Sequence, residues 1–108
     1  MDDKKFTYPG RLDRCRERAW QSARTASHIL RERFGASRVV VFGSLSRPSD
    51  FTQWSDIDLA AYGIPPERFY RAVADVTGFS REFEIDLTDV ETCPPGLLKA
   101  VEKEGIDL

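Results

Sequence analysis

The apolar positions of the chain follow two periods, one typical of helices and one typical of strands. From Leu12 to Phe34 apolar residues recur three and four positions apart, which predicts one buried face of a long helix that ends at Gly35. Three shorter segments are rich in β-branched and aromatic residues or alternate apolar with polar residues. We therefore expect three strands, at residues 38–42, 57–62 and 83–88.

Two proline pairs predict where further helices begin. Pro65-Pro66 and Pro94-Pro95 each suit a first helical turn, and apolar residues follow both pairs at helical spacing. Helices and strands in this αβαβα order indicate an α/β fold, in which helices cover a small sheet of three or four strands. At 108 residues, of which 41% are hydrophobic, the chain is expected to form a single domain over residues 1–108.

The strand at 38–42 leads directly into Gly43-Ser44. A glycine lets a ligand come close to the backbone, because no side chain stands in the way. The N–H groups of such a turn, together with the Ser44 hydroxyl, can hold a phosphate. Gly43 and Ser44 are therefore candidate nucleotide-binding residues.

Three aspartates form the second candidate feature. Asp56 and Asp58 are two residues apart, so strand alternation places them on one face while Ile57 and Leu59 point into the core. Asp86 lies on the polar face of the strand at 83–88 and approaches them if the two strands are neighbours. Three carboxylates suit two Mg²⁺ ions, or Mn²⁺, in phosphoryl or nucleotidyl transfer. The alternative is that these acids are only a cap and an exposed strand residue.

Taken together, the motifs resemble the minimal nucleotidyltransferase (MNT) family of the DNA polymerase β superfamily. The family pattern is a strand, Gly-Ser, a loop with Arg-Gly, Ser-Asp-x-Asp-Leu and a later strand aspartate. The corresponding segments here are V-F-G-S-L-S-R-P, S-D-I-D-L and E-I-D-L-T-D-V. The resemblance covers nearly the whole chain and implies a nucleotidyltransferase fold with a mixed sheet. Two departures are Pro48, in place of the loop glycine, and a spacer between Ser44 and Asp56 that is one residue longer than usual.

The resemblance also implies an activity, the transfer of AMP from ATP to a hydroxyl group with Mg²⁺ as cofactor. The implied catalytic and metal-binding residues are Asp56, Asp58 and Asp86, and the implied nucleotide-binding residues are Gly43, Ser44 and Arg47. Arg47 matches the arginine of the family loop, although an exposed loop arginine is an equally good interpretation. Glu84 shares a face with Asp86 but has no counterpart in the family motif.

Family members of this size typically stand beside a HEPN-domain protein in prokaryotes and form a toxin–antitoxin pair with it. The resemblance therefore implies an antitoxin that adds AMP to a tyrosine of a HEPN toxin. The alternative is a binding antitoxin or scaffold subunit that keeps the fold without turnover. The departures in the loop leave room for this second function.

Charge and cysteine content refine this picture. Residues 1–48 hold 11 Lys and Arg against 5 Asp and Glu, whereas residues 49–108 hold 5 against 13. The basic half could attract phosphates, RNA or an acidic protein, although a solvated helix face is the commoner explanation of arginine clusters. Cys15 and Cys93 are expected to be reduced thiols. Because the chain has no long apolar segment and no signal peptide, we expect a cytoplasmic protein that does not bind a membrane. We also expect that it does not bind nucleic acid directly.

Overall fold

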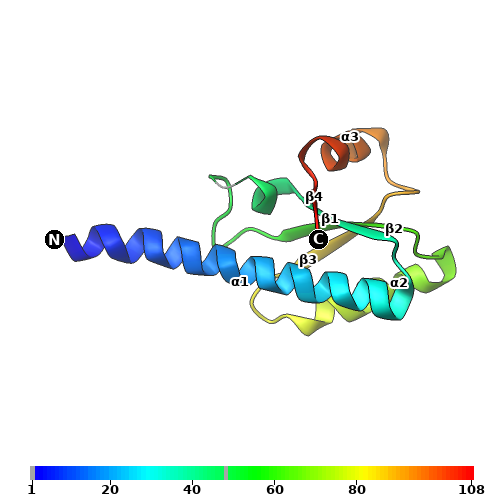
Figure 1. Ribbon diagram of the computed structural model, residues 1–108, viewed down its shortest axis with the longest axis horizontal. Helices are drawn as coiled ribbons and strands as arrows, with labels where there is room; N and C mark the ends of the chain where they lie inside the picture. The colour runs from blue at the N-terminus through cyan, green and yellow to red at the C-terminus, as the bar shows by residue number, and fades with distance from the viewer. Residues whose placement is uncertain (1, 48) are drawn as a thin grey trace.

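Three helices and a four-stranded sheet make up the fold of the computed structural model (Figure 1). The structure describes the backbone of residues 2–47 and 49–108 and the side chains of residues 14–47 and 49–108. Pro48 and the side chain of Leu12 therefore lie outside the described residues. In chain order the elements are α1 (Asp2–Phe34), β1 (Arg38–Phe42), the 3₁₀ turn η1 (Gly43–Ser46), β2 (Ile57–Tyr62), α2 (Pro66–Phe79), β3 (Ile85–Asp89), α3 (Pro95–Glu104) and β4 (Ile106–Asp107).

The sheet is mixed and has the order β3-β2-β1-β4. β1 pairs antiparallel with β2 and with β4, whereas β2 pairs parallel with β3. All three predicted strands are present, and the third begins two residues later than the alternation indicates. The fourth strand is only two residues long and follows α3 directly, so the sheet has the larger of the two expected strand numbers.

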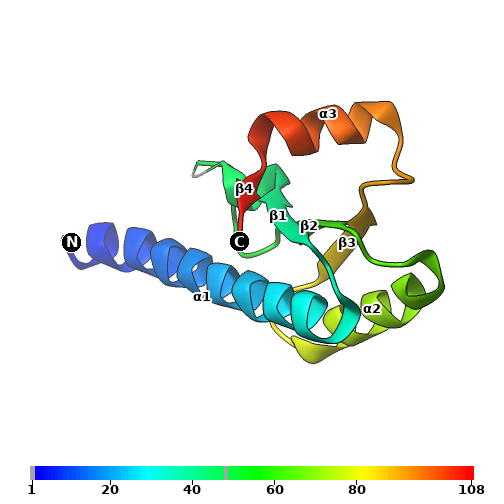
Figure 2. The same cartoon turned by 45° about the vertical axis from the view of Figure 1, so that its right-hand side comes forward.

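Helices cover both faces of the sheet, as Figure 2 shows, with α1 and α2 on one side and α3 on the other. The larger core lies on the side of α1 and α2 and includes Val41 and Leu59. A smaller cluster joins Val40 and Ala60 to Val101 of α3. Strand alternation therefore separates β2 into a face toward α1 and α2 and a face toward α3.

The helical stripe predicted for α1 is confirmed where side chains are described. Its buried members are Cys15, Ala19, Ala23, Ala26, Leu30 and Phe34. Four of these six, the cysteine and the three alanines, are small, which lets α1 lie close to the sheet. The N-terminal part of α1 extends beyond the sheet (Figure 1). Over the described residues, none of the helices combines the length and apolar character needed to cross a membrane, and both cysteines are free thiols.

Candidate functional site

The backbone turns sharply where β1 passes into η1, and this turn forms one wall of the site. Gly43 has φ +73°, a conformation that favours glycine. A Cβ atom at this position would overlap Asp58 Oδ2 and lie 3.2 Å from Asp58 Cγ. The glycine is therefore required both by the turn and by the carboxylate that packs against it. The Ser46 hydroxyl donates to the Gly43 carbonyl at 2.6 Å, which closes the turn.

The sheet brings two of the three predicted acids together. Asp58 on β2 and Asp86 on β3 are direct partners in the parallel register. Asp58 follows the alternation of Ala60, so it lies on the α3 face, opposite the buried Ile57 and Leu59. Asp56 immediately precedes β2 and is exposed, as is Asp86, whereas Asp58 is half-buried.

The electrostatics of Asp58 reflect this crowding. Burial, followed by the negative charges of Asp86 and Asp56, raises its pKa from 3.8 to about 6, and the positive charge of Arg47 acts in the opposite direction. Within residues 14–47 and 49–108, whose side chains are described, no three His, Cys, Asp or Glu side chains stand in an arrangement that is ready to hold a metal ion. The acids are therefore neighbours by register without forming a closed ligand cluster.

Arg47 and Glu104 form a contact that the sequence analysis missed. Arg47 Nη1 donates to Glu104 Oε1 at 2.8 Å and to Oε2 at 2.7 Å, and Arg47 Nε donates to Asp50. Glu104 Oε1 also accepts the backbone N–H of Gly43 at 3.1 Å. No local pattern marks Glu104, because the contact depends on α3 returning to the turn after β1. Arg47 is exposed, and its guanidinium is paired with both Glu104 and Asp50.

The remaining predicted residues lie around this centre. Ser44 is half-buried in η1, and its carbonyl accepts the backbone N–H of Arg47 at 3.1 Å. Glu84 is exposed, and its carbonyl accepts the N–H of Ile57 at 2.9 Å, which aligns β2 with the segment before β3. Trp54 is 84% exposed in the loop that leads to Asp56.

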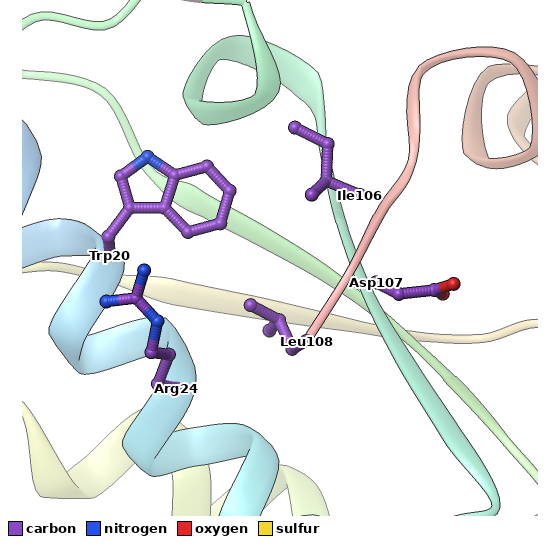
Figure 3. A pocket seen from close by; sticks show the side chains of 5 residues that line it. All are labelled: Trp20, Arg24, Ile106, Asp107 and Leu108. Carbon is purple, nitrogen blue, oxygen red and sulfur yellow. The ribbon is translucent and has the colours of Figure 1, made fainter.

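A separate shallow pocket of about 380 Å³ lies between α1 and β4 (Figure 3). Its lining residues are Trp20, Arg24, Ile106, Asp107 and Leu108. None of the three predicted acids lines it. The sequence allowed Trp20 to be a core residue or a partner anchor; the side chain is half-buried, packs on the larger core, and carries the Arg24 guanidinium 5.7 Å from its ring centre.

Comparisons with known proteins agree with this fold. Residues 23–106 match the family described as nucleotidyltransferase domain. A toxin–antitoxin complex with AMP-PNP has a similar structure, with a TM-score of 0.64 and 19% identity over 79% of this chain and 70% of that chain. A mutant of the MntA–HpeT toxin–antitoxin complex has a TM-score of 0.63 and 22% identity over 79% of this chain and 69% of that chain. The MntA–HepT toxin–antitoxin complex has a TM-score of 0.60 and 16% identity over 82% of this chain and 69% of that chain.

At these identities the structural likeness shows the fold, and no curated protein matches the sequence. The family match rests on the sequence itself and extends over residues 23–106. It includes the turn at Gly43, the loop with Arg47, and all three aspartates on or beside β2 and β3. This chain therefore belongs to the nucleotidyltransferase domain family.

Proposed function

We propose that the protein transfers AMP from ATP to a tyrosine hydroxyl of a HEPN-domain toxin and thereby acts as its antitoxin. The observation that carries the proposal is the register pair of Asp58 and Asp86 beside the turn at Gly43. This pair puts two acids next to a backbone segment suited to phosphate. Membership of the nucleotidyltransferase family supports the transfer chemistry. Toxin–antitoxin complexes among the similar structures support the kind of partner.

The side chains present fit a divalent cation. Carboxylate oxygens are the ligands that Mg²⁺ prefers, and Mg²⁺ commonly takes one or two of them together with substrate phosphates. Burial, Asp86 and Asp56 raise the pKa of Asp58 although Arg47 acts to lower it, so the charge of these acids is only partly compensated by the chain itself. Bound Mg²⁺ would neutralise the triphosphate and the acids together. Asp56 and Asp86 are exposed, so their side chains are free to turn toward Asp58.

In this mechanism the chain positions the triphosphate and the attacking hydroxyl. The N–H groups of the turn and the Ser44 hydroxyl hold the β- and γ-phosphates, and Arg47 neutralises part of their charge. The tyrosine oxygen forms a bond to the α-phosphorus, and Asp86 accepts the proton that the tyrosine hydroxyl loses. The bond between the α-phosphorus and the bridging oxygen breaks, and pyrophosphate leaves with the electron pair.

The direct test is to co-express the chain with its neighbour, the proposed HEPN-domain toxin, to purify the pair and to incubate it with ATP and Mg²⁺. Intact-protein mass spectrometry should show that the neighbour gains one AMP group, and peptide mapping should place it on a tyrosine. A matched reaction with the Asp86→Asn variant should leave the neighbour unmodified. An unmodified neighbour in the wild-type reaction, under conditions where the complex is intact, would contradict the transfer mechanism.

A binding antitoxin without turnover is the second candidate function. The observation that favours it is in the sequence of the loop, where Pro48 replaces the family glycine and the spacer between Ser44 and Asp56 is one residue longer than usual. Neutralisation of the toxin in cells separates the two candidates. If the Asp56→Asn variant protects cells as well as the wild type, binding alone is sufficient; if protection is lost while the complex still forms, transfer is required.

A further inference from the structure

The hydrogen-bond donors at the proposed phosphate position already hold an anion, the carboxylate of Glu104. Its Oε1 accepts the Gly43 N–H at 3.1 Å and Arg47 Nη1 at 2.8 Å, and its Oε2 accepts Arg47 Nη1 at 2.7 Å. A backbone N–H in a turn combined with a guanidinium is a donor set that binds phosphate oxygens. Glu104 therefore uses the same hydrogen-bond donors that a triphosphate would need.

Backbone packing fixes Glu104 at this place. The next residue, Gly105, lies so close to α3 and β1 that an added Cβ would overlap the Val101 carbonyl and a methyl group of Val40. The Gly105 N–H donates to the Val101 carbonyl at 2.9 Å, which ends α3 beside η1. Figure 2 shows the end of α3 next to the turn that follows β1. The carboxylate is thus delivered to the turn by the end of a helix and not by a mobile loop.

A nucleotide that binds at Gly43 would be repelled by the negative charges around the contact between Glu104 and Arg47. Asp58 carries a raised pKa caused by burial and by the carboxylates of Asp86 and Asp56, and Glu104 adds to the same effect. Arg47 is the cation that faces this group, and it also binds Asp50. A polyphosphate placed against Gly43 and Arg47 would meet the Glu104 carboxylate directly, so both anions cannot use these donors at once.

We propose that Glu104 competes with the phosphates of the nucleotide for the hydrogen-bond donors of the nucleotide site. Its carboxylate holds the Gly43 N–H and the Arg47 guanidinium until the β- and γ-phosphates of a metal-bound nucleoside triphosphate displace it. A carboxylate tethered to the same chain competes at high effective concentration. A single weak anion therefore fails to replace it, whereas a polyphosphate with its cation succeeds. This inference rests on the proposed function, because it assumes that the turn at Gly43 receives phosphate.

The Glu104→Gln variant removes the competing charge and keeps the shape of the side chain. Two matched controls use neighbouring acids. Glu102→Gln removes one charge from an exposed position of the same helix. Asp50→Asn removes the other carboxylate bound to Arg47 but leaves the Gly43 N–H occupied.

Titration calorimetry with Mg²⁺ should be run with two probes, AMP-PNP and inorganic tripolyphosphate. Glu104→Gln should bind both probes about tenfold more tightly than the wild type, which corresponds to ~1.4 kcal/mol. Glu102→Gln should change affinity by less than about twofold, because an exposed charge is screened. Asp50→Asn should fall between them. Without ligand, Glu104→Gln should also unfold at lower urea concentration than the wild type, since its contact with Arg47 is weakened.

The opposite signs of these two effects identify competition, because a merely structural residue would lose stability and affinity together. Equal or weaker binding by Glu104→Gln, no binding of either probe by any variant, or the same gain in Glu102→Gln would overturn the inference. The proposed function fails separately. If Glu104→Gln binds the probes more tightly than the wild type but no partner is modified, the inference on Glu104 holds and the proposed transfer is wrong. If the partner is modified but Glu104→Gln gains no affinity, only the inference on Glu104 is wrong.

Discussion

Replacement of Asp58 by asparagine is expected to stabilise the metal-free protein at neutral pH. Burial, Asp86 and Asp56 raise the pKa of Asp58 from 3.8 to about 6, so the folded state binds this proton more tightly than the unfolded chain does. Stability therefore falls as the pH rises from about 4 to about 6, and the full penalty applies above that window. Asparagine has the shape of the carboxyl group without its charge, so it removes the penalty.

The size of the effect follows from the change in pKa. One pKa unit corresponds to about 1.36 kcal/mol, so the rise to about 6 has an upper limit of ~3 kcal/mol for a fully buried group. Asp58 is half-buried, and solvent screens its interactions with the neighbouring acids. We therefore expect a gain of ~1–2 kcal/mol in the free energy of unfolding at pH 7, and almost none below about pH 4.

Urea unfolding in the presence of a chelator, followed by far-ultraviolet circular dichroism between pH 4 and pH 8, measures this gain directly. The matched control is Glu84→Gln, which removes an exposed carboxylate from the segment before β3. Its unfolding free energy should change by less than about 0.5 kcal/mol at every pH. A gain for Asp58→Asn that is absent at pH 7, or equal at pH 4 and pH 7, would refute the electrostatic argument.

Four further predictions concern metal dependence, catalysis, the backbone turn and the partner. In calorimetry, AMP-PNP should bind far more weakly in chelator than with Mg²⁺, and Asp56→Asn should lower AMP transfer about 100-fold or more while circular dichroism remains unchanged. Gly43→Ala should destabilise the protein in urea by about 1–3 kcal/mol, because φ is +73° and the new methyl group overlaps an aspartate. Arg14→Glu should weaken the partner complex and alter its salt dependence in size-exclusion chromatography if α1 forms the interface. Arg14 is preferred to Arg18 for this test, since Arg18 Nε already binds Glu82 at 2.7 Å.

Much of the fold could be predicted because its signals are local. The apolar stripe of α1 and the alternation along β2 depend only on helical and strand periods, and both are confirmed. The pairing of Asp58 with Asp86 follows as soon as β2 and β3 are adjacent and parallel. The alternation predicts a start of β3 two residues before the observed one, because Phe83 is buried like a strand residue although it lies in the preceding bend.

Other features depend on contacts between distant parts of the chain. β4 has two exposed residues, so neither its length nor its polarity distinguishes it from a loop. The helix predicted after Pro94-Pro95 gives no local reason to single out Glu104. Its contact with Gly43 exists because Gly105 allows α3 to approach Val40, which is a matter of packing across 61 residues of sequence. Sequence periodicity carries no information on such an approach.

The two faces of β2 explain why the site can be altered without loss of the fold. Leu59 and its neighbours on the α1 and α2 side are fully buried, and truncating a buried leucine typically costs about 2–5 kcal/mol. Asp58 and Asp86 lie on the α3 side, where Val40 and Ala60 form a much smaller cluster. Removing a charge there relieves repulsion and leaves the larger core intact. Loss of transfer in an asparagine variant that is as stable as the wild type, or more stable, would therefore be assigned to chemistry and not to unfolding.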